Sequence, residues 1–161
     1  MTLPVDESEL PKLTMSQHVA ASYRRRYPHS SKAVGHARRD IVEFAKGCGF
    51  SGQALDDIEV AVGEGLANAV EHAQRDDRGL EVSVQRDARA LIVEIKDSGR
   101  GFDHGGVCAR SRPPAEALRG FGTFIMRELM DEIRYSELGT RLRLLKKLPP
   151  DEAHDQPAVR A

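Results

Sequence analysis

The stretch from Ser51 to Ala73 limits the possible folds most, because its apolar residues recur at helical spacing along its whole length. Ser51 is a typical N-cap residue, which predicts that a helix begins there. The apolar stripe is wide, as expected of a helix that packs on a sheet. The stripe consists of Leu55, Ile58, Val62, Leu66, Ala69, Val70 and Ala73.

A second helix is predicted upstream. Ser30 and Ser31 resemble an N-cap, and the Gly47-Cys48-Gly49 stretch ends the helical pattern. Before this helix, residues His18 to Tyr27 fit an edge strand that Pro28 terminates. The apolar positions of the predicted helix are Val34, Ala37, Ile41, Phe44 and Ala45.

Strand patterns follow the long helix. Residues 80–85 alternate apolar and polar side chains, as a half-buried strand does. Residues 91–95 form a richer apolar run, which predicts a central strand. The remaining predicted segments are a turn at Arg75–Gly79, a helix from near Gly122, and a closing hairpin of Ile133–Tyr135 and Arg141–Leu145 that turns at Gly139.

The predicted order is strand, helix, helix, strand, strand, loop, helix, strand, strand. Helices in such an order can cover one face of a sheet and leave the other to solvent, so we expect an α/β two-layer sandwich. The length of 161 residues suits one domain with its own core. We expect a flexible N-terminal segment over 1–17, a folded domain over 18–148 and a C-terminal tail over 149–161.

Composition argues against several classes of protein. The net charge is −1, without the basic field that nucleic-acid or membrane binding normally needs. The N-terminus lacks the features of a signal peptide, and no apolar stretch is long enough to span a membrane. Cys48 and Cys108 form no paired motif, which favours free thiols in a reducing compartment. We therefore expect a cytoplasmic protein.

Glu64 and Asn68 are the first candidate site residues. They lie four positions apart in EGLANAVEHA, so a helix places both side chains on one face, about one turn apart. A carboxylate and a carboxamide in this arrangement suit a hard cation and its water ligands. As an isolated pair, they would more simply be two solvated side chains.

A glycine-rich loop begins where the predicted central strand ends. Asp97-Ser98-Gly99-Arg100-Gly101 follows the apolar run directly, and the sequence stays aperiodic as far as Gly120. A carboxylate at a strand end can accept a hydrogen bond from an exocyclic amine, and neighbouring glycines let a flat ring approach the backbone. Long loops of this kind are usually functional or mobile. Taken alone, the motif also fits an ordinary turn.

The third motif, Arg119-Gly120-Phe121-Gly122, opens a predicted helix. Glycines before a helix expose backbone N–H groups at the positive end of the helix dipole, where phosphate binds well. Arg119 would add a permanent planar charge suited to phosphate. A single G-x-G before a helix is also common in tight turns.

The order and spacing of the motifs are more specific than any one of them. E-x-x-x-N-A-x-x-H, D-x-G-x-G and G-x-G, followed by Gly139-Thr140, resemble the N box and the glycine boxes of the GHKL (Bergerat-fold) ATP-binding family. The similarity runs from about Ala33 to Leu148. The short chain and the continuation of the last helix into LMDEIRY most resemble bacterial anti-sigma factor serine/threonine kinases, of the anti-sigma-B and sporulation types.

This resemblance implies a Bergerat fold, with a mixed and mostly antiparallel sheet and helices on one face. It implies that Glu64 is the general base and that Asn68 binds Mg²⁺ as well as ATP. Asp97 would accept a hydrogen bond from the adenine amine, helped by Thr140. The adenine would pack close to Gly99 and Gly101.

The resemblance also assigns the phosphate end of the site. The phosphate-binding residues would be Arg119, Gly120, Phe121, Gly122 and Thr123, and residues 103–119 would form the ATP lid. The implied partners are a sigma factor, which is held inactive, and a STAS-type anti-anti-sigma factor, which is phosphorylated on serine. The family usually forms homodimers.

Two features depart from the family pattern. Gly63 and Gly65 flank Glu64 where Ser and Ala are more usual, and glycine inside a helix costs about 1 kcal/mol against alanine, which predicts a looser helix there. The lid is short, and Arg119 matches the family's phosphate-binding arginine only loosely. His72 belongs to the N-box pattern, but a role in helix packing is the simpler interpretation.

Two alternative functions stay open at this point. The first is a nucleotide-gated binding module that transfers no phosphate, which a looser helix around Glu64 would favour. The second is the catalytic domain of a histidine kinase. That class carries a dimerisation helix with an acceptor histidine, and residues 1–30 show no heptad pattern for one.

Overall fold

The computed structural model describes residues 21–72, 78–99, 121–136 and 139–150. The order of its elements is the predicted one. Residues 18–20 of the predicted edge strand, residues 75–77 of the predicted turn and the predicted ATP lid lie outside the described ranges. The helices are α1 (Ser31–Gly47), α2 (Gly52–His72) and α3 (Phe121–Leu129). The strands are β1 (Ser22–Tyr27), β2 (Leu80–Asp87), β3 (Ala90–Lys96), β4 (Glu132–Tyr135) and β5 (Arg141–Lys147).

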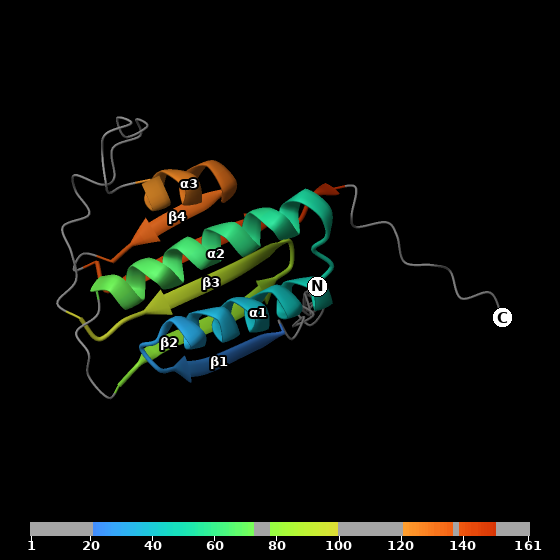
Figure 1. Cartoon of the computed structure of the whole chain (residues 1–161). Helices are drawn as coiled ribbons and strands as arrows, with labels where there is room; N and C mark the ends of the chain where they lie inside the picture. Colours follow the sequence, from blue (N-terminus) through green and yellow to red (C-terminus); the bar gives the residue numbers. More distant parts are fainter. Residues whose placement is uncertain (1–20, 73–77, 100–120, 137–138, 151–161) are drawn as a thin grey trace, which may run out of the picture.

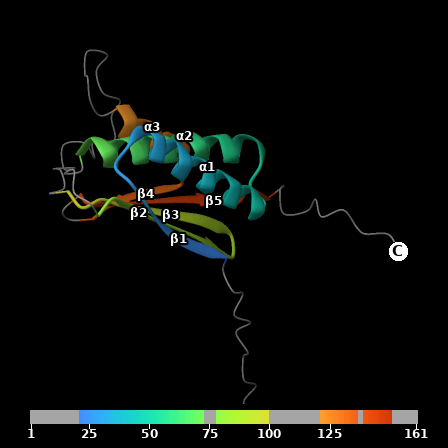
Figure 2. The same ribbon diagram turned by 60° about the horizontal axis from the view of Figure 1, so that its bottom comes forward.

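The elements form two layers, with the helices on one face of a sheet (Figures 1 and 2). The strand order is β1-β2-β3-β5-β4, so β3 is central and β1 is an edge strand, as predicted. All four strand pairs are antiparallel. The pairs β2–β3 and β4–β5 are hairpins, and β1–β2 and β3–β5 join strands that other elements separate in the chain. The expected parallel component of a mixed sheet is therefore absent from the described strands.

Local sequence signals set the ends of α1. The Ser30 side chain accepts a hydrogen bond from the backbone N–H of Ala33 at 3.2 Å, which confirms the predicted N-cap. At the other end, the N–H of Cys48 donates to the carbonyl oxygens of Phe44 and Ala45. Gly49 then adopts a positive φ of 93°, a conformation that favours glycine and turns the chain toward α2.

Alternating strand residues supply the sheet side of the core. Val82 pairs with Ile95, and Ile95 pairs with Leu142 on β5. The next inward row joins Val84, Val93 and Leu144 in the same way, and all six side chains are buried. The apolar stripe of α2 packs above these rows, with Ile58, Val62 and Leu66 fully buried. This packing fixes α2 over the central strands, so polar residues on its flank are held rigidly.

Gly65 is a packing residue and does not loosen α2. The helix is continuous from Gly52 to His72, and Gly65 faces the sheet. A β-carbon at this position would lie 2.7 Å from Leu142 Cδ2 and 3.2 Å from Ile95 Cδ1. Glycine thus allows the close approach of α2 to β3 and β5, a packing role that the sequence did not predict.

Gly63 provides a matched control for this packing role. A β-carbon there would meet only Arg38, at 3.5 Å or more. Gly63→Ala should therefore stabilise the fold by up to about 1 kcal/mol through helix propensity. Gly65→Ala should destabilise it by about 1 kcal/mol, because overpacking outweighs the same gain. Urea unfolding of the two variants measures both effects, and an equal stabilisation by both would contradict the packing role.

Candidate functional site

The first and third motifs of the site meet at the start of α3. A β-carbon added to Gly122 would lie 2.6 Å from a carboxylate oxygen of Glu64. It would also lie 3.5 Å and 3.7 Å from the amide nitrogen and oxygen of Asn68. Since α2 and α3 pack against each other, the first turn of α3 lies directly on the face of α2 that carries these two side chains. Residues that are far apart in the chain thus form one polar cluster.

Asp97 lies where β3 ends, next to the start of β5. Its backbone N–H donates to the carbonyl of Thr140 at 3.0 Å, which continues the β3–β5 pairing by one residue. Its carboxylate accepts a hydrogen bond from the N–H of Gly99 at 2.7 Å. The residue is only 8% exposed. One carboxylate oxygen is thus held by the backbone, which orients the side chain.

A small cavity connects Asp97 to Asn68. Its volume is about 10 Å³, and it opens between α2 and the adjacent ends of β3, β4 and β5. The residues that line it include three predicted site residues, and its walls are otherwise mostly apolar. The complete lining is Gly65, Asn68, Ala69, Ile95, Asp97, Tyr135, Gly139, Thr140 and Leu142.

The environment of Asp97 disfavours its charged form. Burial raises the pKa of this carboxyl. The hydrogen bond from Gly99 and the charges of His29 and His72 act in the opposite direction, but the pKa stays above its ordinary value. A carboxylate kept in an apolar setting, with one oxygen already bonded, is a strong acceptor for one further donor.

The remaining predicted site residues belong mostly to the phosphate motif. Thr123 is buried in the first turn of α3, and Phe121 is the first residue of that helix. Gly101, Arg119 and Gly120 lie outside the described residues. The structure therefore brings together Glu64, Asn68 and Gly122 at one end of the site, and Asp97, Gly99 and Thr140 at the other.

Two residues near the site were not identified from the sequence. Tyr135 lines the cavity because β4 places it opposite Leu142. His29 follows β1, and its charge acts on Asp97, as does that of His72 at the end of α2. Both ring nitrogens of His29 are buried without a hydrogen-bond partner in the described part of the chain. The hairpin register could have identified Tyr135, but no sequence signal placed His29 beside Asp97.

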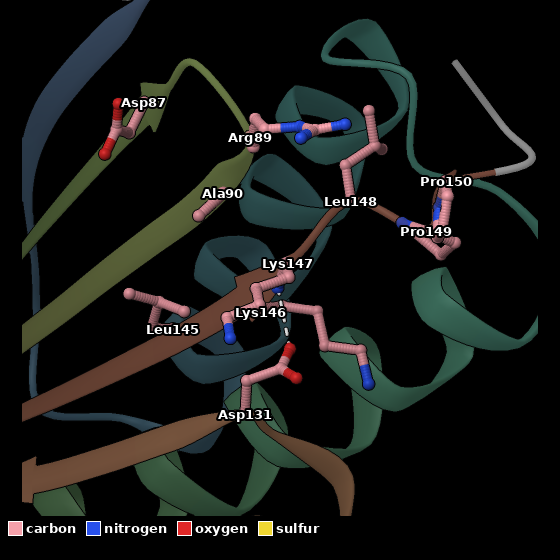
Figure 3. A pocket seen from close by; sticks show the side chains of 10 residues that line it. All are labelled: Asp87, Arg89, Ala90, Asp131, Leu145, Lys146, Lys147, Leu148, Pro149 and Pro150. Atoms are coloured by element: carbon pink, nitrogen blue, oxygen red, sulfur yellow. Dashed lines mark hydrogen bonds between the residues drawn. The ribbon is translucent and has the colours of Figure 1, made fainter. Parts of the chain in front are cut away.

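A larger cavity of about 670 Å³ lies at the opposite end of the sheet (Figure 3). Asp87, Ala90 and Lys147 at the ends of the strands contribute to its lining, with Leu148 and Pro149 beyond them. None of the predicted site residues lines it. The smaller cavity has room for about one water molecule, but it is lined by the buried carboxylate of Asp97, and we therefore take its surroundings as the candidate site.

Within the described ranges, no group of three or more His, Cys, Asp or Glu side chains could hold a metal ion. Among the same residues, no helix has both the length and the apolar character needed to cross a membrane.

The chain is similar to curated serine-protein kinases named RsbW. The protein from Oceanobacillus iheyensis is 31% identical over 135 residues, which cover 78% of this chain and 85% of that protein. The protein from Bacillus subtilis is 30% identical over 116 residues, covering 66% of this chain and 72% of that protein.

Solved structures show the same fold. The RsbU and RsbW domains of a Mycobacterium tuberculosis protein match with a TM-score of 0.55 and 17% identity, covering 80% of this chain and 32% of that one. The SiaB–SiaC complex from Pseudomonas aeruginosa matches with a TM-score of 0.51 and 12% identity, covering 78% and 89%. A model of the histidine kinase-like ATPase domain matches residues 27–146. The chain belongs to the histidine kinase-like ATPase family, which implies ATP binding, and its curated relatives are RsbW serine-protein kinases.

Proposed function

We propose that this protein is an ATP- and Mg²⁺-dependent serine/threonine protein kinase that acts as an anti-sigma factor. The observation that carries the proposal is the contact of Gly122, at the start of α3, with both Glu64 and Asn68. This contact puts a candidate base and a candidate cation ligand beside the helix start that would bind phosphates. The names of the curated relatives support the same activity.

The base of the nucleotide would bind at Asp97. One carboxylate oxygen accepts the Gly99 N–H, and the other would accept a hydrogen bond from the exocyclic amine of adenine. Thr140, at the mouth of the same cavity, would support this contact. Gly99 and Gly101 would allow the ring to approach the backbone. The arrangement selects adenine because a base with a carbonyl at that position would face a carboxylate.

The phosphates would lie between the start of α3 and Asn68. Backbone N–H groups of Gly120, Phe121, Gly122 and Thr123 would bind them, and Arg119 would add a positive charge. The residues present fit Mg²⁺, which prefers few protein ligands and binds largely through phosphates and water. The Asn68 carboxamide oxygen would hold the ion, which when bound neutralises phosphate charge.

Glu64 would act as the general base. Phosphoryl transfer depends mainly on positioning and charge stabilisation, with one group to orient or deprotonate the attacking hydroxyl. Glu64 lies one helical turn from Asn68 on the same face, so its carboxylate would border the proposed phosphate site. A serine hydroxyl entering beside Glu64 would pass its proton to the carboxylate as its oxygen attacks the terminal phosphorus. The bond from that phosphorus to the β–γ bridging oxygen would break, and ADP would leave.

The proposed partners are a sigma factor and a STAS-type anti-anti-sigma protein that carries the acceptor serine. We further propose a cytoplasmic homodimer that contacts neither nucleic acid nor membrane directly. The alternative of a binding module without phosphate transfer loses its main support, because Gly65 is tightly packed and α2 is continuous around Glu64.

Gly122→Ala tests the observation behind the proposal. The added methyl group would displace the Glu64 carboxylate, so phosphate transfer to the serine of a purified anti-anti-sigma protein should fall at least tenfold. Gly35→Ala on α1 is the control, because a β-carbon there would meet no atom within 4 Å. Its transfer rate should match that of the wild type. Equal rates for all three proteins would contradict the assigned site.

A further inference from the structure

A part-buried ion pair joins three elements at the opposite end of α3 from the proposed phosphate site. The ammonium of Lys146 on β5 donates to Asp57 Oδ2 on α2 at 2.7 Å and to the carbonyl of Leu129 at 2.6 Å. Leu129 is the last residue of α3. The two charged side chains are only 15% and 14% exposed. Lys146 therefore ties β5 to α2 and to the end of α3.

The spacing of this tie matches the spacing of the proposed site. Asp57 precedes Glu64 by seven residues on α2, and Leu129 follows Gly122 by seven residues on α3. Seven residues are about two helical turns and span about 10 Å, so each pair lies on one side of its helix. Figure 1 shows α2 and α3 side by side and running in opposite directions. The two helices are thus linked at two levels. Glu64 lies against Gly122, and Lys146 bridges Asp57 to Leu129.

Both oxygens of the Asp57 carboxylate accept hydrogen bonds, and the ion pair with Lys146 favours its charged form. Gln53 donates a second hydrogen bond to Asp57, at 2.8 Å. Burial raises the pKa of Asp57, but the hydrogen bonds from Lys146 and Gln53 and the Lys146 charge together outweigh it, so the pKa lies below its ordinary value. The cation also sits at the negative end of the α3 dipole. The adjacent Lys147 differs, because it is exposed and its backbone N–H donates to Asp131, although both lysines line the large cavity (Figure 3).

We infer that Lys146 and Asp57 are positioning residues that fix how far α3 lies along α2, and thereby hold the start of α3 against Glu64 and Asn68. The inference rests on the proposed function. Neither residue lines the cavity at Asp97. Their loss should therefore weaken the binding of phosphates while leaving the binding of the adenine end unchanged.

Lys146→Met tests this role when its affinities for ATP and for adenosine, which lacks the phosphates, are compared. Calorimetric titration at a temperature where the variant is folded should show ATP binding about tenfold weaker than in the wild type, with unchanged affinity for adenosine. Lys146→Arg keeps the charge and should restore most of the ATP affinity. Lys147→Met is the matched control, since it removes the neighbouring charge without touching the tie, and it should bind ATP as the wild type does.

Asp57→Asn provides a second variant if Lys146→Met does not fold, and it should show the same selective loss. A parallel loss of ATP and adenosine affinity would show a merely structural role and would overturn the inference. Unchanged ATP affinity in a folded variant would overturn it as well. A wild-type protein that binds neither ligand would instead refute the proposed function, and the positioning role with it.

Discussion

Glu64→Gln should abolish most phosphate transfer while leaving ATP binding nearly intact. The carboxamide has almost the same shape as the carboxylate, but it cannot take a proton from the acceptor serine. General-base catalysis contributes about 10²- to 10⁴-fold to such reactions, so the rate of transfer should fall by about that factor. Gly122 contacts this side chain closely, so a change of similar size should leave the first turn of α3 in place.

The measurement is single-turnover transfer of phosphate from ATP to the serine of a purified anti-anti-sigma protein, together with the dissociation constant for ATP. Glu59→Gln is the control, because Glu59 lies on the same helix but is exposed beside Arg38. A folded Glu64→Gln variant that retains a tenth or more of the wild-type rate would remove Glu64 from the mechanism. It would favour a role for Glu64 in packing against α3.

Asp97→Asn should prevent tight binding of ATP. The introduced carboxamide could no longer accept at both positions, because one oxygen is replaced by an NH₂ donor. That donor would face either the Gly99 N–H or the amine of adenine. Two buried N–H donors that face each other without an acceptor cost about 3 kcal/mol of binding free energy, which corresponds to a loss of ATP affinity of about 100-fold. Titration with ATP measures the loss, and Asp87→Asn at the exposed β2–β3 turn is the control.

The same substitution should not lower the stability of the protein at neutral pH. Burial raises the pKa of Asp97 above its unfolded value, so this group stabilises the fold below the unfolded pKa. That contribution is lost as the pH rises through the folded pKa. Above that pH, the buried charge of Asp97 lowers the free energy of unfolding. Urea unfolding at pH 7 should therefore show Asp97→Asn to be at least as stable as the wild type. A large destabilisation would mean that Asp97 serves the fold and not a ligand.

The local elements of this fold could be predicted from the sequence because their signals are local. Ser30 caps α1, the wide apolar stripe defines α2, and alternation marks β2. The hairpin at Gly139 follows from the positive φ that glycine allows. The antiparallel character of the whole sheet was less accessible, because pairings between distant strands such as β3 and β5 leave no mark on either strand alone.

The candidate site was predictable as a list of residues but not as an arrangement. Motif spacing identified Glu64, Asn68 and Asp97, yet their proximity to Gly122 or Thr140 depends on how α3 and β5 pack. Gly65 was misjudged for the same reason, since helix propensity ignores the sheet beneath the helix. The Lys146–Asp57 tie joins residues 89 positions apart, and no periodic pattern connects them.

Titration of the protein with ATP by calorimetry, with and without Mg²⁺, tests the central claim most directly. The wild type should bind ATP, and Mg²⁺ should tighten the binding. Asn68→Ala should remove most of the Mg²⁺ dependence, because the proposed protein ligand of the ion is lost. Absence of wild-type binding at millimolar ATP would contradict the account. So would a Mg²⁺ dependence in Asn68→Ala equal to that of the wild type.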